Sequence, residues 1–200
     1  MAKVLFVAAE AVPFVKTGGL ADVVGSLPKE LKRQGTDIRV ILPKYGDISP
    51  VWRERMEYVK RLEITLGWRR LYCGIEKLEH EGIIYYFIDN EYYFRRQGLY
   101  GFYDDGERFS YYCRAVLEAL PYLGFTPDII HCHDWHSALV PVFLHARYRS
   151  QPPYDKLKTV LTIHNIEYQG RFGAETVEDL FGLDKGWYGD GTLAMDGDVN

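Results

Sequence analysis

Buried stretches alternate with a helical pattern along the first forty residues. Residues 3–9 form a continuous apolar run, which is typical of a strand buried on both faces of a sheet, and residues 37–42 form another. Between them, a glycine-containing loop leads into a predicted helix that ends near Gly35 and that Pro28 is expected to bend or divide. Its apolar positions fall at helical spacing: Leu20, Val23, Val24, Leu27 and Leu31. This order predicts a βαβ unit and therefore a parallel sheet.

The remaining pattern extends this unit. Three β-rich stretches separated by turns predict an antiparallel insertion, and an irregular loop rich in Gly, Tyr and Asp follows it over residues 90–106. Alternating helices and strands come next. The stretches are strands at 58–66, 68–79, 82–89, 128–132 and 159–163, and helices at 109–124, 135–149 and 174–181. We therefore expect one α/β domain with a doubly wound parallel sheet and an antiparallel β insertion.

Composition narrows the class of protein. The chain has 24 Lys and Arg against 28 Asp and Glu, and this net charge of −4 argues against a duplex nucleic-acid partner. No apolar run reaches the roughly 18 residues that cross a membrane. The three cysteines are widely spaced, which disfavours a disulfide framework and favours a cytoplasmic protein. Twelve aromatic residues between 85 and 112 suit either an aromatic core or stacking on sugars.

The loop after the first strand has features of an anion site. Gly18 and Gly19 would let a ligand approach the backbone, and the start of the following helix offers free amides. Lys16 adds a positive charge beside them. The order of lysine and glycines matches neither a P-loop nor G-x-G-x-x-G, which weakens the ATPase and dinucleotide interpretations. From the pattern alone, a structural turn is an equal alternative.

Polar residues also follow two later strands. The segment 131–136, HCHDWH, suggests zinc, but its spacing matches none of the common zinc patterns, so no metal site is predicted. Asp134 instead follows one strand, and His164 and Asn165 follow the next. Because the carboxyl ends of parallel strands form one ligand crevice, Lys16, Asp134 and His164 are expected to converge. The residues Asp196-Gly-Asp198 resemble metal motifs but are interpreted as a turn.

Three segments together carry a family resemblance. VLFVAAEAVPFVKTGGLADVVGSLP, HCHDWHSALVP and TIHNIEYQG, in this order, resemble bacterial glycogen synthases and plant starch synthases. The resemblance extends from Val4 to about Gly182. It implies a retaining glycosyltransferase of the two-domain GT-B fold, in which residues 1–200 form a truncated, Rossmann-like, acceptor-side N-terminal domain. The C-terminal nucleotide-binding domain is then absent from this sequence, and the fragment alone is expected to be inactive.

The resemblance also implies a substrate set and roles for individual residues. Glucose passes from ADP-glucose to the 4-hydroxyl at the non-reducing end of an α-1,4-glucan, without a metal or other cofactor. Lys16, Gly18 and Gly19 map onto residues at the donor, and Asp134 and His164 onto residues at the transferred glucose, with Asn165 a weaker substrate-binding candidate. Two alternatives stay open. One is a stand-alone glucan- or nucleotide-binding module, and the other is a related GT-B transferase that uses UDP-glucose.

Overall fold

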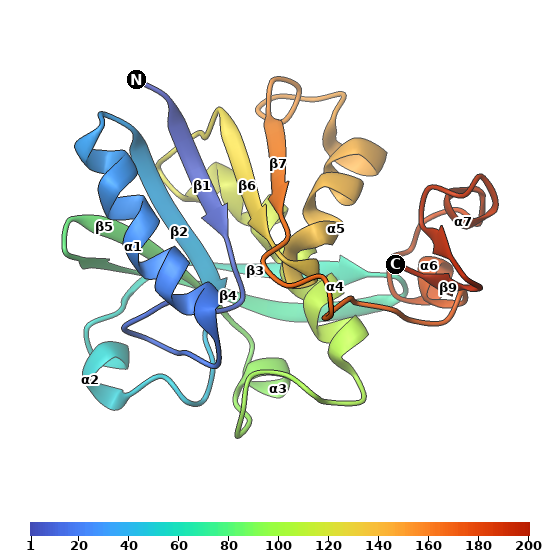
Figure 1. Ribbon diagram of the computed structural model, residues 1–200, viewed down its shortest axis with the longest axis horizontal. Coiled ribbons are helices and arrows are strands. Elements are labelled where there is room, and N and C mark those ends of the chain that lie inside the picture. The colour runs from blue at the N-terminus through green and yellow to red at the C-terminus, as the bar shows by residue number, and fades with distance from the viewer.

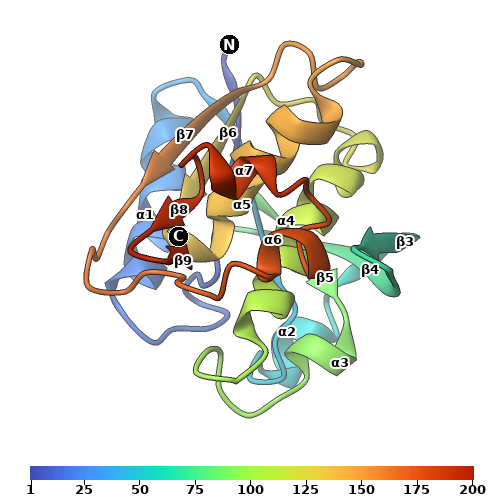
Figure 2. The ribbon, with the colours of Figure 1, turned by 90° about the vertical axis from the view of Figure 1, so that its right-hand side faces the viewer.

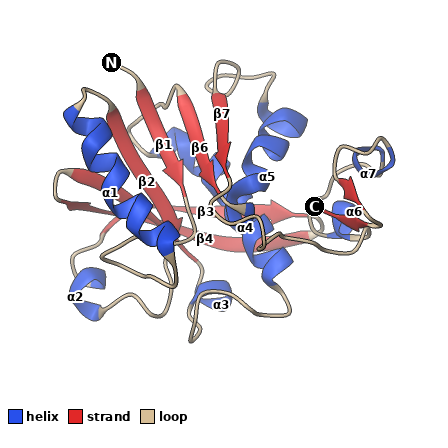
Figure 3. Cartoon of the chain, in the orientation of Figure 1, coloured by secondary structure: helices blue, strands red, loops and turns tan.

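A computed structural model describes residues 1–200 and contains one seven-stranded sheet with the order β3-β4-β5-β2-β1-β6-β7 (Figures 1 and 3). Strands β5, β2, β1, β6 and β7 are parallel to one another, whereas β3 and β4 join β5 as an antiparallel meander. The bounds are β1 Lys3–Val7, β2 Asp37–Pro43, β3 Glu57–Leu66, β4 Arg69–His80, β5 Ile83–Asp89, β6 Ile129–His133 and β7 Lys158–Thr162. The predicted parallel sheet with an antiparallel insertion is confirmed.

Helices cover both faces of this sheet. Helix α1 lies on one side and α4 and α5 lie on the other, which is the doubly wound arrangement (Figure 2). The long helices are α1 Gly19–Arg33, α4 Asp105–Ala119 and α5 Trp135–Phe143. The short elements are α2 Pro50–Arg53, α3 Glu91–Phe94, α6 Thr176–Asp179, α7 Gly186–Gly189, β8 Ala194–Met195 and β9 Asp198–Val199. No helix in the structure combines the length and the apolar character that crossing a membrane requires.

The apolar run at the N-terminus explains the centre of the sheet. Strand β1 pairs with β2 on one side and with β6 on the other, so both of its faces lie under helices. Leu5, Phe6 and Val7 are fully buried as a result, within a single core cluster of 54 buried residues. This rigid centre fixes where the loops at the carboxyl ends of the strands begin.

Two local predictions are wrong: the division of a helix at Pro28 and the irregular structure throughout residues 90–106. Helix α1 runs without a break through Pro28, which is buried in its packed face. A proline removes one backbone hydrogen bond, and the packing of the surrounding turns tolerates this loss. The segment 90–106 is not irregular throughout, because it contains α3, whose first turn is capped by the Asn90 side chain accepting from the Tyr93 amide.

Most of the aromatic segment belongs to the core. Eight of its twelve aromatic side chains are buried, whereas Tyr92 and Tyr103 are exposed. The buried ones are Tyr85, Tyr86, Phe87, Tyr93, Phe94, Phe109, Tyr111 and Tyr112. The interpretation as an aromatic core is therefore confirmed for these eight. Tyr100 is partly buried and lines the cleft described below.

Candidate active site

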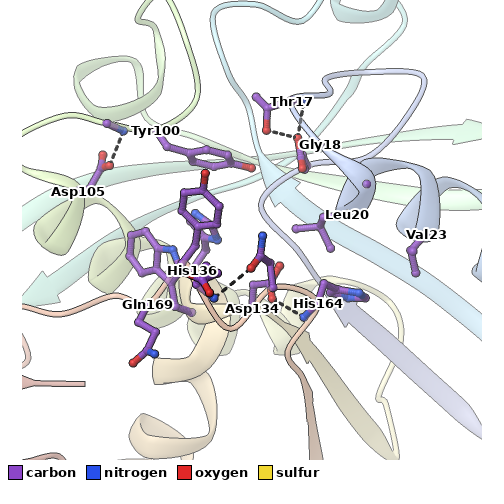
Figure 4. A pocket seen from close by; sticks show the side chains of 17 residues that line it. Thr17, Gly18, Leu20, Val23, Tyr100, Asp105, Asp134, His136, His164 and Gln169 are labelled. Atoms are coloured by element: carbon purple, nitrogen blue, oxygen red, sulfur yellow. Dashed lines mark hydrogen bonds between the residues drawn. The ribbon is translucent and has the colours of Figure 1, made fainter. Parts of the chain in front are cut away.

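A cleft of about 970 Å³ opens at the carboxyl ends of β1, β6 and β7. Thr17, Gly18 and Tyr100 lie on one side of its opening, and Asp134 and His164 lie on the other (Figure 4). Of the six residues predicted from the sequence, five line this cleft: Gly18, Gly19, Asp134, His164 and Asn165. The expected convergence of Lys16, Asp134 and His164 is therefore confirmed for Asp134 and His164.

The first side of the cleft consists largely of backbone. Gly18 is the extended residue before α1, so the free amides at the start of this 15-residue helix face the cleft. The buried Glu10 carboxylate holds the loop, because its Oε2 accepts from the Thr17 amide at 2.5 Å and from the Thr17 hydroxyl at 2.9 Å. An anion would meet amide donors here that are already fixed in position.

Lys16 is the predicted site residue that does not line the cleft. Its Nζ forms an ion pair with the Asp22 carboxylate, at 2.7 Å from both oxygens, and both side chains are about half exposed. The charge of Lys16 thus lies beside the glycines but points back onto α1. A role for Lys16 at a ligand requires that the side chain leaves Asp22.

The second side of the cleft consists of side chains. A strained backbone and several hydrogen bonds hold them in position. Asp134 has φ 58° and ψ 178°, a region that is almost restricted to glycine. Its amide donates to the Thr162 carbonyl at 2.9 Å, and its Oδ1 accepts from the His164 amide at 2.7 Å. Ser137, fully buried, donates its hydroxyl to the carbonyls around this turn. Strands β6 and β7 are thereby tied together where the two predicted catalytic residues lie.

The three histidines of HCHDWH do not form a common set of ligands. His131 Nε2 is hydrogen-bonded to the Thr162 hydroxyl at 2.7 Å, and His133 Nδ1 to His164 Nε2 at 2.9 Å. His136 is buried against the rings of Tyr100 and Trp135. No group of three His, Cys, Asp or Glu side chains in the structure could hold a metal ion.

Sequence reasoning missed Glu10, Tyr100 and Asp105, which all line the cleft. The Asp105 carboxylate accepts from the amides of Gly101 and Phe102 and pairs with the fully buried Arg108, so it fixes the loop that carries Tyr100. Burial, and secondly the Glu10 carboxylate, raises the pKa of Tyr100, so its hydroxyl stays protonated. Its hydroxyl oxygen is buried beside the Thr17 hydroxyl.

The fold and this cleft define a class of protein. A parallel sheet that presents a glycine-led helix start and a carboxylate at its carboxyl edge belongs to the α/β domains that bind a ligand in that crevice. The chain belongs to the family of the starch synthase catalytic domain, whose model matches residues 3–200. The resemblance stated from the three sequence segments is thereby confirmed.

Individual relatives agree with this membership. The chain is 61% identical to the glycogen synthase of Anoxybacillus flavithermus over 90% of its own length and 37% of the relative. It is 57% identical to the glycogen synthase of Desulforamulus reducens over 99% of its own length and 41% of the relative. Among solved structures, the catalytic domain of starch synthase IV from Arabidopsis thaliana, bound to ADP and acarbose, matches with a TM-score of 0.88 at 34% identity, over 100% of this chain and 42% of that one. The chain thus spans about 40% of the relatives it matches, and the expected half of a GT-B fold is confirmed.

Proposed function

We propose that the protein to which this chain belongs transfers glucose from ADP-glucose to the non-reducing 4-hydroxyl of an α-1,4-glucan, with retention of configuration. The observation that carries the proposal is the cleft itself, in which helix amides lie opposite Asp134 and His164. Membership of the starch synthase family and the structural neighbour bound to ADP and acarbose support the same substrates.

The two sides of the cleft fit the two charges that develop in this reaction. The departing ADP is anionic, and the amides of α1 together with Lys16 would stabilise it. The sugar becomes oxocarbenium-like and positive, and the Asp134 carboxylate would stabilise it from the other side. His164 and Asn165 supply polar groups for sugar hydroxyls. The donor phosphate itself would take the proton of the acceptor hydroxyl, on the same face from which ADP leaves.

We further propose that residues 1–200 act as the acceptor-side domain and that a second, nucleotide-binding domain completes the cleft. The length of the relatives that the chain does not match, about 60%, supports this division. Alone, the chain leaves the donor phosphates exposed to water, where charge interactions are weak. We therefore expect the 200-residue chain to fold but to transfer no glucose. Its three free thiols support a cytoplasmic location.

The test is a transfer assay on the complete protein with glycogen as acceptor and radiolabelled ADP-glucose or UDP-glucose as donor. Label incorporated from ADP-glucose, and much less from UDP-glucose, supports the proposal. Preference for UDP-glucose would indicate the related transferase instead, and binding of either ligand without transfer would indicate a binding module. Activity should survive exhaustive chelation, and a loss that zinc or manganese restores would contradict the metal-free mechanism.

A further inference from the structure

Three histidine rings form a row that leads from the sheet to the cleft. The rings of His131 and His133 stack with centroids 4.3 Å apart, whereas those of His133 and His164 lie edge to edge, with centroids 5.2 Å apart and only 14° between their planes. Phe6 packs against the two rings on β6. The outermost ring, that of His164, is exposed and lines the cleft (Figure 4). The ring of His133 is buried.

The middle ring is neutral. Burial, followed by the charges of His131 and His164, lowers the pKa of His133 to about 3. At neutral pH His133 therefore carries one ring proton, on either Nδ1 or Nε2. The position of this proton decides what His164 presents to the cleft, because the two side chains share the 2.9 Å hydrogen bond between His133 Nδ1 and His164 Nε2.

The surroundings of His133 distinguish the two tautomers. Its Nε2 is buried and has no hydrogen-bond partner. A proton on Nε2 would create an orphaned buried N–H, which folded proteins almost never contain. A proton on Nδ1 avoids this, and it is donated to His164 Nε2. His164 must then accept at Nε2, so when neutral it carries its own proton on Nδ1, which has no partner in the protein.

We infer that His133 is a positioning residue that holds His164 in the tautomer with the proton on Nδ1, so that His164 donates a hydrogen bond to an oxygen of the bound sugar. The sugar as ligand rests on the proposed function, whereas the tautomer rests on the contacts and the burial of His133. With Nε2 engaged by His133, His164 has no free acceptor nitrogen and cannot serve as a general base toward the acceptor hydroxyl. The same bond fixes the orientation of the ring.

Three substitutions separate this role from simple packing. The amide nitrogen of His133→Asn reaches the position of Nδ1, whereas that of His133→Gln reaches the position of Nε2, and His133→Phe keeps only the ring. In the complete protein, we expect Asn to keep kcat/KM within about threefold of wild type. Gln and Phe should lose about tenfold, the equivalent of about one net hydrogen bond. Thermal unfolding identifies any variant that fails to fold, and it is excluded from the comparison.

The tautomer is measured directly by nitrogen NMR on the histidine-labelled wild-type chain. We expect His164 to show a protonated Nδ1 and an unprotonated Nε2, and expect His133→Phe or His133→Gln to mix the two forms. A protonated Nε2 on His164 in the wild type would overturn the inference, as would equal losses of kcat/KM in all folded variants. If the complete protein transfers no glucose while the tautomer is as expected, the proposed function fails and the positioning of His164 stands.

Discussion

The two sides of the cleft differ in what they offer a ligand. On the side of β1, the cleft offers backbone amides at Gly18 and Gly19, and the side chain of Glu10 holds the loop. On the side of β6 and β7, the cleft offers the side chains of Asp134 and His164, which hydrogen bonds to the His164 amide and to His133 hold in place. The first side thus suits a ligand with diffuse negative charge, and the second suits one whose atoms must be placed individually.

Removal of the Asp134 carboxylate should have the largest effect. In Asp134→Ala the side of the cleft that we propose faces the transferred sugar loses its charge and also its hydrogen bond to the His164 amide. We expect kcat/KM of the complete protein to fall about a thousandfold or more, equivalent to about 4 kcal/mol. Initial rates with ADP-glucose and glycogen measure this. A fall of less than tenfold would contradict the assignment of Asp134 to the reacting sugar.

The sequence pattern was enough to predict that Asp134 and His164 lie together, because the carboxyl ends of strands in a parallel sheet meet at one edge. Asp134 and His164 each directly follow a recognisable strand, so topology alone brought them together. Glu10 and Tyr100 carried no such signal. Glu10 directly follows an apolar run, and its partner Thr17 becomes apparent only when the loop folds back. Tyr100 lies among eleven other aromatic residues, and the ion pair of Asp105 and Arg108 that positions its loop is visible only in three dimensions.

The fold was also predictable from the sequence pattern. The errors of prediction lie where tertiary packing overrides the local conformational preference of a residue. The apolar periodicity located all seven strands of the main sheet. Pro28 disfavours a helix interior locally, yet the packing of α1 on the sheet keeps the helix continuous. The cap at Asn90 was a usable local signal for α3 that the glycines and tyrosines around it obscured.

Lys16→Ala should affect the donor side less than Asp134→Ala affects the sugar side, because the amides of α1 remain. We expect kcat/KM for ADP-glucose to fall by one to two decades, or about 2–3 kcal/mol, mainly through the donor KM. The fold should be unaffected, since the Lys16 side chain is half exposed and pairs only with Asp22. Asp22→Ala is the control, because it releases the lysine without removing its charge. Wild-type kinetics in Lys16→Ala would exclude Lys16 from the donor site.

On the side of β6, lowering the pH should reduce the free energy of unfolding through His136. Burial, and secondly the charge of Arg108, lowers the pKa of His136 to about 3 from an ordinary 6.5. Below pH 6.5 the unfolded chain takes up a proton that the folded chain refuses, so stability falls as the pH drops toward 3. From pH 6.5 to pH 5 this histidine alone should cost about 2 kcal/mol.

Urea unfolding at the two pH values measures the effect of His136. In His136→Gln the drop between pH 6.5 and pH 5 should be smaller than in the wild type by about that amount. His145→Gln is the matched control, because His145 is exposed, and it should leave the drop as it is. Equal drops in His136→Gln and the wild type would mean that His136 is protonated in the folded chain.

The smallest expected effect is the stability difference between two variants at position 134, which distinguishes the backbone strain of Asp134 from the role of its carboxylate. At φ 58° and ψ 178° a residue with a side chain carries about 1–3 kcal/mol of backbone strain, whereas glycine adopts this conformation without it. Asp134→Gly and Asp134→Ala both lose the carboxylate, so their difference in stability contains the backbone strain but not the loss of the carboxylate. Glycine also loses more entropy on folding, by about 0.4–1 kcal/mol, which leaves Asp134→Gly more stable than Asp134→Ala by about 1 kcal/mol.

The same pair at the exposed Asp155, which is not among the residues with positive φ, should favour alanine instead. Urea unfolding of the four variants decides between these signs. Should alanine be the more stable residue at 134 as well, the backbone there is unstrained, and the position of Asp134 is set by its hydrogen bonds to Thr162 and His164 alone.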